Sequence, residues 1–409
     1  MFKMRKVVLI ILLLFTSLKF DTYAQWVSLG AFDSPVTSLF AKEGMLFAGT
    51  YYGGIFSSSD NGLHWNSSRP VQYDGGIYTF AATDSFVFAG SDGGGVFRIN
   101  NNDSTWTPVN NGLTNLSIYS LAHNNNILLA GTDGSGIFIS TNSGFEWKPS
   151  NTGLTQMGVH ALAVQGANIF AGLDGNGGVF RSTNNGASWS KATTGLNDTV
   201  ITILAVGGSH LFAGTWKSGL FVSNDSGMSW QKSDTGLPDK YITQCVVNND
   251  EVLIGTGWGD AYLSINYGSS WKETNQGLDR QYVSALAVNN SYYFLANWYA
   301  GLYRRPISDI VEEVKILDEN VLQKINLMQN FPNPFNPTTN ISFSLSKRVY
   351  VSLSIYNLLG QTIATLVSEY LPAGTYRQEW NAKDYPSGIY FYQLKAGSFS
   401  ETKKLILLR

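Results

Sequence analysis

Cysteine is nearly missing from this sequence, since Cys245 is the only one among its 409 residues. A single cysteine excludes an internal disulfide, so packing alone has to stabilise the fold. Cys245 lies in the predicted inner strand 243–246, and we interpret it as a buried, unreactive thiol. No Cys/His cluster has the spacing of a zinc site, so the sequence predicts no metal and no cofactor.

Charged residues are also scarce, at 14% of the chain against about 25% in an average globular domain. The net charge is −2, and no basic cluster suits a phosphate backbone, which argues against a nucleic-acid partner. The metalloprotease, nucleophile-elbow and phosphate-loop motifs are missing too, which favours a non-catalytic protein. We interpret the histidines as ordinary turn or strand residues: His64, His123, His160 and His210.

Long hydrophobic runs are absent apart from one short stretch at the N-terminus. A basic start, Lys3 to Lys6, precedes the apolar segment 7–15 and a small-residue cleavage site that ends at Ala24. This order is typical of a secretory signal peptide, which we predict over residues 1–24. The apolar segment is too short to span a membrane comfortably. We therefore expect an exported protein without a membrane span once the signal is cleaved.

The sequence is rich in one internal repeat. Short apolar runs, separated by Gly, Asn and Ser turns, return every 41 or 42 residues. A period of this length is typical of four-stranded blades around an axis. The predicted fold is therefore all-β, a seven-bladed β-propeller. One glycine marks each copy, with alanine in the seventh: Gly49, Gly90, Gly131, Gly172, Gly214, Gly255 and Ala296.

A second pattern, Ser-x-Asp-x-Gly-x-x-Trp, lies between the third and fourth strands of most copies. In the third copy we expect these strands at 136–140 and around Trp147. The pattern resembles the Asp box of the sialidase-like (BNR) propellers. The resemblance implies a structural hairpin, in which Asp or Asn binds backbone amides of the turn and Trp seals the blade edge. Its residues are Asp60, Trp65, Asn142, Trp147, Asn184, Trp189, Asp225, Trp230, Asn266 and Trp271.

The tryptophans predict how the ring closes. Six copies end in a tryptophan, but the seventh has Glu312 at that position. Trp26 lies 39 residues before Trp65, ahead of the first blade. We therefore expect residues 25–29 to supply the outer strand of the last blade, which removes exposed strand edges. The propeller is predicted over residues 25–306.

The composition changes after the ring. Residues 307–328 mix apolar and acidic residues, which predicts a linker with one short helix. Strand patterns between Ile341 and Leu408 then predict an immunoglobulin-like β-sandwich. Residues 329–409 are similar to the type A C-terminal sorting domain of the type IX (Por) secretion system, which implies a Gram-negative bacterium, contact with the type IX machinery and a surface or extracellular location. The motif residues are Asn333, Pro334, Phe335, Gly388, Tyr390, Lys403 and Lys404.

The loops between the second and third strands differ around the ring. Blades 2 to 4 carry Asp-Gly there, whereas blades 5, 6, 7 and 1 carry aromatic residues. Asp-Gly forms a hairpin turn in its own right, so turn formation explains the aspartates. Turn formation does not explain tryptophans at exposed loop tips. Packing against neighbouring loops is the alternative to ligand binding. The candidate ligand-binding residues are Tyr51, Tyr52, Trp216, Trp258, Trp298, Tyr299, Asp92, Asp133 and Asp174.

Catalysis has less support than binding. The sialidase resemblance would require a glutamate on the loop face, and none of the four propeller glutamates maps to it. An inverting glycosidase that uses two aspartates stays open. The leading hypothesis is a monomeric, secreted or surface protein that binds glycan or another polymer. The alternatives are a polysaccharide-degrading glycoside hydrolase and a non-catalytic assembly propeller. The aspartates that could reach the face are Asp92, Asp133, Asp174, Asp239, Asp260 and Asp279.

Overall fold

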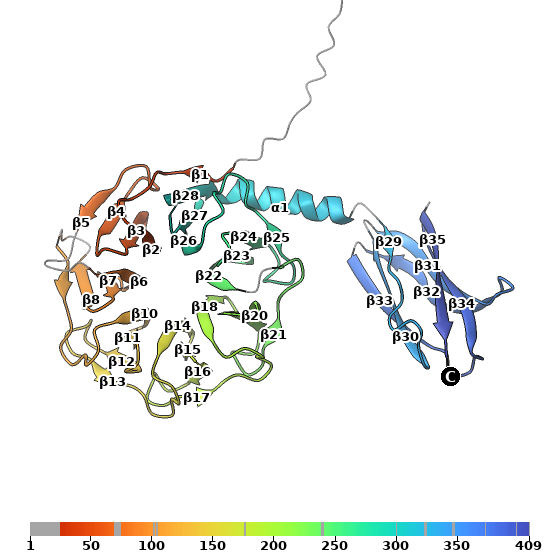
Figure 1. Cartoon of the computed structure of the whole chain (residues 1–409), viewed down its shortest axis with the longest axis horizontal. Coiled ribbons are helices and arrows are strands. Elements are labelled where there is room, and N and C mark those ends of the chain that lie inside the picture. The colour runs from red at the N-terminus through yellow and green to blue at the C-terminus, as the bar shows by residue number, and fades with distance from the viewer. Residues whose placement is uncertain are drawn as a thin grey trace, which may run out of the picture.

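The computed structural model shows a ring of β-sheets, a helix at its edge and a separate pair of sheets (Figure 1). The predicted signal peptide, residues 1–24, lies outside the residues that the structure describes. No helix in the described part of the chain is long and apolar enough to cross a membrane. The structure describes residues 25–409 except 69–74, 101–102, 104, 176, 239–240, 300, 323–324, 346–347, 373, 398 and 409, and only the backbone of 316–322.

Seven antiparallel sheets of four strands form the ring, which confirms the predicted propeller. Blades 1 to 3 contain β2 (Val36–Lys42), β3 (Met45–Thr50), β4 (Ile55–Ser58), β5 (Asn66–Ser68), β6 (Ile77–Ala82), β7 (Phe86–Ser91), β8 (Gly95–Asn100), β9 (Thr107–Pro108), β10 (Ile118–Asn124), β11 (Ile127–Thr132), β12 (Ile137–Ser140) and β13 (Lys148–Pro149). Blades 4 to 6 contain β14 (Val159–Gln165), β15 (Asn168–Leu173), β16 (Gly178–Ser182), β17 (Ser190–Lys191), β18 (Ile201–Gly207), β19 (His210–Thr215), β20 (Leu220–Ser223), β21 (Gln231–Lys232), β22 (Ile242–Asn248), β23 (Glu251–Thr256), β24 (Ala261–Ser264) and β25 (Lys272–Glu273). Blade 7 contains β26 (Val283–Val288), β27 (Tyr292–Asn297), β28 (Gly301–Pro306) and β1 (Val27–Ser28).

The repeat glycine lets neighbouring blades approach one another. In β11, residues 128–132 are all buried, because both faces of the sheet pack against other blades. A Cβ atom added to Gly131 would lie 2.3 Å from Ser120 Oγ and 2.7 Å from Val159 Cγ1. Val159 begins the inner strand of the next blade. A side chain at this position would therefore push two sheets apart.

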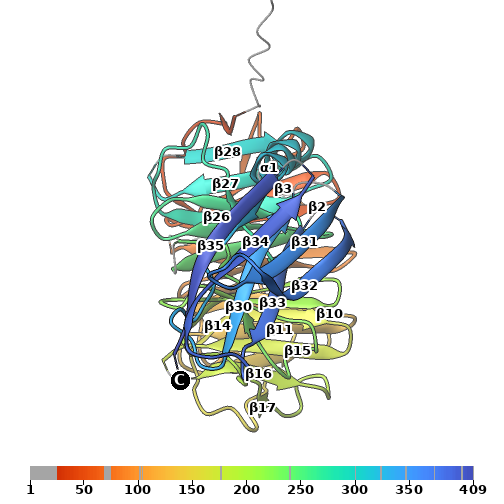
Figure 2. The same ribbon diagram turned by 90° about the vertical axis from the view of Figure 1, so that its right-hand side faces the viewer.

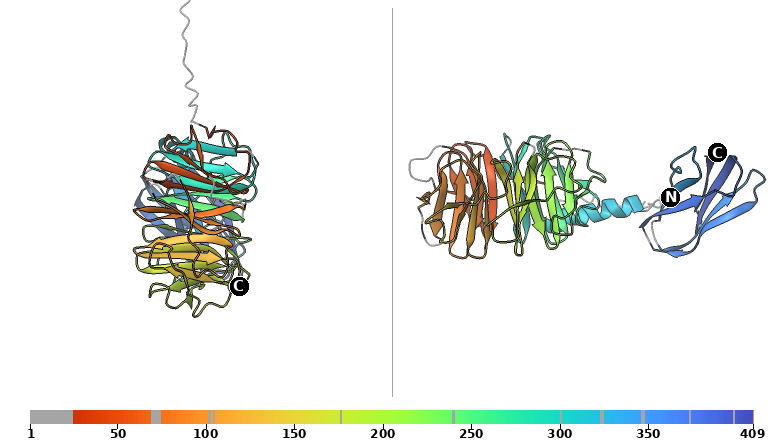
Figure 3. Two further views of the ribbon diagram at one scale, coloured as in Figure 1. Left: turned by 90° about the vertical axis from the view of Figure 1, so that its left-hand side faces the viewer. Right: turned by 90° about the horizontal axis from the view of Figure 1, so that it is seen from below.

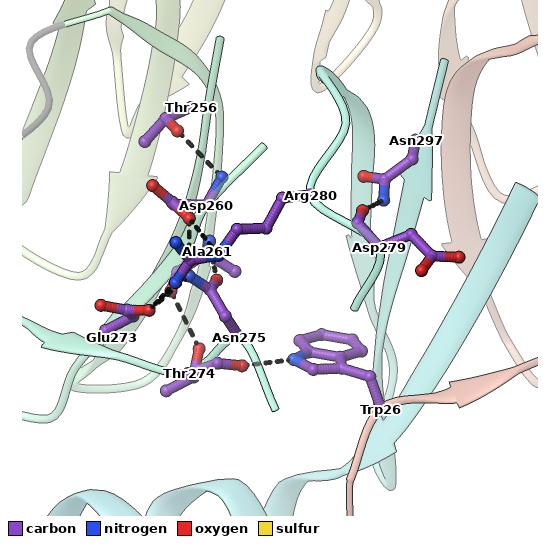
Figure 4. Close-up of polar contacts among 10 residues, drawn as sticks. All are labelled: Trp26, Thr256, Asp260, Ala261, Glu273, Thr274, Asn275, Asp279, Arg280 and Asn297. Atoms are coloured by element: carbon purple, nitrogen blue, oxygen red, sulfur yellow. Dashed lines mark hydrogen bonds and ion pairs between the residues drawn. The ribbon is translucent and has the colours of Figure 1, made fainter. Parts of the chain in front are cut away.

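The start of the chain completes the last blade, as predicted, because β1 pairs with β28. Trp26 is buried and donates its Nε1–H to the carbonyl of Thr274 at 2.7 Å (Figure 4). Trp147, Trp189 and Trp230 make the same kind of bond to the blade before their own. Trp26 therefore takes the place of the tryptophan that the seventh copy lacks.

The side chain of Asp or Asn fixes the turn before the outer strand in blades 1, 3, 4, 5 and 6. Asp60 Oδ1 accepts hydrogen bonds from the Ser58 hydroxyl at 2.8 Å and from the backbone N–H of His64 at 3.0 Å. The bond from the His64 backbone is the main reason that the pKa of Asp60 lies below its usual range. The expectation that the tryptophan lies within the outer strand is wrong, because Trp147 ends the turn and β13 begins after it. Equivalent pairs of bonds are accepted by Asn142, Asn184 and Asn266.

The predicted linker contains a longer helix than expected. Helix α1 (Ile307–Leu322) has 16 residues and leads from the ring to the sandwich (Figure 3). Its Ile310 and Val314, one turn apart, are buried in the core of the last blade. Glu313 forms an ion pair with Arg305 of β28, whose side chain is fully buried. These contacts fix the first half of α1 to the ring, which an extended linker would not do.

Two packed sheets form the C-terminal sandwich, with strand orders β29–β30–β33 and β32–β31–β34–β35 (Figure 2). Every second residue of β30 is buried, since only one face of the sheet meets the core. Two motif residues, Phe335 and Tyr390, lie in this core. The strands are β29 (Asn326–Leu327), β30 (Thr338–Leu345), β31 (Val349–Tyr356), β32 (Thr362–Leu371), β33 (Gly374–Asn381), β34 (Gly388–Ala396) and β35 (Phe399–Leu407).

Candidate ligand site at the channel mouth

One backbone hydrogen bond in each blade builds the rim of the central channel. The residue two positions after the repeat glycine donates its N–H to the loop that precedes the inner strand, as Trp298 does to Tyr282 at 2.9 Å. Both loops of a blade therefore meet at one face of the ring, the channel mouth. The donors are Tyr51, Asp92, Asp133, Asp174, Trp216, Gly257 and Trp298, and the acceptors are Pro35, Gly76, Ser117, Gly158, Val200, Tyr241 and Tyr282.

The mouth opens into a cavity of about 610 Å³ whose walls are the inner strands of all seven blades. This volume falls within the range of small-molecule sites, about 300–1,000 Å³. The residue twelve positions before the repeat glycine lines the cavity in every blade. These residues are Thr37, Tyr78, Tyr119, His160, Thr202, Thr243 and Ser284.

Five rings form an aromatic arc along one side of the mouth: Trp216, Tyr241, Tyr282, Trp298 and Tyr51. The centroids of consecutive rings lie 4.3, 6.1, 6.3 and 5.5 Å apart. Trp216 remains 47% exposed and Tyr51 39% exposed. The rings therefore pack on one another, as the alternative to ligand binding requires, and still present apolar surface to solvent.

Blade 6 contributes to the aromatic arc through Tyr241, which the sequence analysis did not select. Gly257 occupies the rim position there, and a Cβ atom on it would lie 2.1 Å from Tyr241 Cδ1. The missing side chain lets the Tyr241 ring lie across the blade, with its hydroxyl 3.3 Å from that of Tyr282. Burial raises the pKa of Tyr241 well above its usual value, and the bond to Tyr282 raises it further. Tyr241 is therefore a neutral ring at every physiological pH.

The structure does not bring Trp258 into the aromatic arc. Trp258 is 77% exposed and does not line the cavity. Tyr299, which has the same position in blade 7, is 78% exposed. Tyr52 has this position in blade 1 and contacts only the end of the arc, with its ring 5.2 Å from that of Tyr51. Two residues after the repeat residue, Trp216 and Trp298 line the cavity, whereas no residue at the next position does.

Three aspartates of blades 2 to 4 form an acidic wall on the other side of the mouth: Asp92, Asp133 and Asp174. The Ser117 hydroxyl donates to Asp92 Oδ1 at 2.7 Å. A Cβ atom on Gly158 would lie 2.2 Å from Asp174 Oδ2, so this glycine lets the carboxylate lie against the start of β14. The aspartates are thus held at the rim by their neighbours as well as by their own turns.

Rings of three neighbouring blades lie in the channel beside the acidic wall. Tyr119 is 5.4 Å from both Tyr78 and His160, measured between ring centroids. Burial, followed by the charges of Asp92 and Asp133, raises the pKa of Tyr119. His160 is a strand residue, as predicted, but the prediction missed that it lines the cavity. His160, Tyr78 and Tyr119 each lie twelve residues before the repeat glycine of their blade. This shared spacing could have placed His160 in the channel.

Asp133, His160 and Asp174 are the one group among the described residues whose ligand atoms could hold a metal ion, since these atoms lie within 4.8 Å of one another. Carboxylate and imidazole donors suit several divalent cations. The three residues come from two blades, so their spacing in the sequence gave no metal-binding pattern. Of the other candidate aspartates, Asp260 pairs with Arg280 (Figure 4) and Asp239 lies outside the described residues.

Two family profiles match parts of the chain. Residues 329–408 match the secretion system C-terminal sorting domain, Por_Secre_tail. Residues 117–252 match the DUF6242 β-propeller domain. A search of curated proteins found no significant match.

Propellers are also found among similar solved structures. PorZ of Porphyromonas gingivalis, described as an essential surface component of the type IX secretion system, has 16% identity and a TM-score of 0.54 over 93% of this chain and 60% of its own. YCF48 of Cyanidioschyzon merolae has 14% identity and a TM-score of 0.53 over 69% and 98%. A xyloglucanase of Xanthomonas campestris has 15% identity and a TM-score of 0.56 over 70% and 54%. At these identities the likeness shows the fold alone.

The fold and the tail define the class of this protein: a β-propeller protein made for export. The tail then specifies the route, because its sorting domain directs the chain through the type IX secretion system to the cell surface or the extracellular space. The tail also implies that the chain contacts the type IX machinery. The chain spans about 60% of PorZ and about 54% of the xyloglucanase, so the activities of those whole proteins do not transfer with the fold.

Proposed function

We propose that the propeller is a secreted or surface binding protein whose channel mouth binds a glycan chain. The aromatic arc is the observation that carries this proposal. It presents partly exposed rings in a continuous row along a cavity of about 610 Å³. Aromatic rings stack on the apolar faces of sugar rings, whereas isolated packing would bury the rings more completely.

Polar groups beside the aromatic arc supply the hydrogen bonds that a sugar needs. Thr202, Thr243 and Ser284 line the cavity beneath the arc, where their hydroxyl groups donate to backbone carbonyls and offer their oxygens as acceptors. Tyr282 presents a hydroxyl at the centre of the arc. A few polar groups in a mostly apolar site fix the orientation of a ligand and give specificity. The mouth combines both kinds of surface, as a site for a sugar chain requires.

Hydrolysis is the second candidate, since Asp133 and Asp174 have carboxylate oxygens within 4.8 Å of each other. Retaining glycosidases hold their two carboxyl groups about 5 Å apart. The two aspartates belong to one wall instead of facing each other across a cleft, which favours binding over hydrolysis. Release of reducing ends from a bound oligosaccharide, lost in Asp133→Asn, would establish hydrolysis.

Titration of the mature chain with a panel of oligosaccharides, followed by tryptophan fluorescence and calorimetry, tests the proposal. We expect an affinity in the millimolar to micromolar range. Trp216→Ala and Trp298→Ala should each weaken binding by about 1–3 kcal/mol. Trp258→Ala is the matched control, because it removes the same side chain from a loop of the same face outside the arc. If no oligosaccharide binds, or if all three variants bind alike, the proposal fails.

A further inference from the structure

The loops that form the channel mouth are strongly acidic. Among their described residues, only Lys217 and Arg280 carry a basic side chain, and both belong to the aromatic half of the ring. Arg280 is engaged by Asp260 and Glu273 in ion pairs. The described acidic residues of these loops are Asp33, Asp92, Asp133, Asp174, Asp198, Asp234, Asp260 and Asp279.

The acidic wall concentrates this negative charge beside the cavity. Asp92, Asp133 and Asp174 come from three consecutive blades, and the described mouth loops of these blades contain no lysine or arginine. Burial and, after it, the charges of Asp92 and Asp133 raise the pKa of Tyr119, whose side chain lines the cavity. A cleft lined by one sign of charge attracts ligands of the opposite sign and repels those of its own.

We infer that the glycans favoured by the channel mouth carry free amino groups, and that uronic or sialic acids are disfavoured. This inference rests on the proposed function and names the class of sugar. Stacking on the aromatic arc is common to every pyranose chain. An ammonium group adds charge-assisted hydrogen bonds to the acidic wall and a cation–π contact with the arc. A carboxylated sugar would bring like charges together at the same wall.

Three tetrasaccharides that differ only at carbon 2 separate charge from shape: the β-1,4-linked tetramers of glucose, N-acetylglucosamine and glucosamine. Calorimetry uses the mature chain at a pH at which the amine is protonated, with EDTA present because Asp133, His160 and Asp174 could bind a metal ion. We expect the glucosamine tetramer to bind about tenfold more tightly than the glucose tetramer. Added salt should weaken only the charged ligand.

Variants of the acidic wall assign the preference to these residues. Asp133→Asn and Asp174→Asn, alone and together with Asp92→Asn, should remove most of the preference for glucosamine and leave the affinity for the glucose tetramer unchanged. Asp250→Asn is the matched control, since Asp250 is an exposed aspartate in a turn between the first and second strands of blade 6, on the opposite face. Trp216→Ala should weaken all three tetramers, because every pyranose chain stacks on the aromatic arc.

The outcomes distinguish the inference from the proposed function. If the tetramers bind with equal affinity, or the triple variant keeps the preference, the inference is overturned while glycan binding stands. If no tetramer binds, both fall. A parallel titration with pentalysine tests whether the acidic wall binds a basic peptide instead of a sugar. Binding of pentalysine without binding of any tetramer would replace the glycan with a basic peptide and overturn both statements.

Discussion

The propeller and the C-terminal sandwich are built from the same kind of antiparallel strand but bury it differently. In β11 of the propeller, residues 128–132 are all buried, whereas burial alternates along β30 of the sandwich. A propeller blade packs on both faces and a sandwich sheet on one. The comparison shows that continuous and alternating apolar patterns in one chain indicate two different ways of stacking sheets.

Charge separates the two regions as well. Residues 25–306 contain 19 acidic and 13 basic residues, for a net charge of −6, while residues 329–409 contain 4 acidic and 8 basic residues, for a net charge of +4. The overall charge of −2 hides this contrast. The ring and the export tail therefore present electrostatic fields of opposite sign to their surroundings.

Removal of the tail should give the largest effect and tests whether the two regions are independent. A chain that ends at residue 328 keeps the whole ring, the closing strand and α1. In a host with type IX secretion, we expect this chain to fold and to remain in the periplasm, because the sorting domain is lost. Fractionation followed by immunoblotting gives the measurement. Normal amounts of truncated protein in the medium would contradict the separation of the two roles.

Loss of Trp26 should give the next largest effect, confined to the ring. Trp26 is buried and ties the outer strand of the last blade to blade 6 through its bond to the carbonyl of Thr274. Trp26→Ala should lower the free energy of unfolding of the propeller by about 3–5 kcal/mol, as other buried tryptophan deletions do. Trp380→Ala, which empties an equally buried position in the sandwich, is the matched control. Calorimetry of the full mature chain should show each variant shifting its own transition only.

The ring, its closure and the sandwich strands could be predicted from the sequence because each depends on a local pattern. The regular spacing of the repeat glycines predicted the blades. The absence of a tryptophan from the seventh copy indicated that Trp26 belongs to the last blade. The tail strands followed from alternation and from glycine turns. Helix α1 was underestimated, because its contacts with the last blade appear only after the ring is closed.

The candidate site was predicted only in part, because it depends on contacts between blades. Tyr241 and Tyr282 were missed, and each is the residue immediately before an inner strand. Only the fold shows that this position touches the rim residue of the same blade. Trp258 was chosen as an aromatic residue at an exposed loop tip. Gly257 beside it has no side chain, so the ring of Tyr241 occupies the space at the rim of blade 6. An alignment of the seven repeats at the residue before each inner strand would have identified both tyrosines.

The smallest expected effect compares the turns of the two regions. Asp225 fixes a propeller turn by accepting bonds from Ser223 and Ser229, and the bond from the Ser229 hydroxyl is the main cause that lowers its pKa to about 2. Asn357 fixes a sandwich turn in the same manner, accepting from the N–H groups of Leu359 and Gln361 at 3.0 Å. The asparagine carries no charge, so only the propeller turn responds to pH.

The sign of this response follows from the lowered pKa of Asp225. An unfolded aspartate has a pKa of about 3.9, so the stabilisation is present above that pH and is lost as the pH falls toward 2. Asp225→Asn should cost no more than about 1 kcal/mol at neutral pH, since Asn184 fixes the equivalent turn and donates to Ser188 at 2.9 Å. Urea unfolding of the unmodified protein and of Asp225→Asn between pH 5 and 2 measures the free energy of unfolding of each. The stabilities should converge as the pH falls, and a constant difference would mean that the charge of Asp225 has no part in the turn.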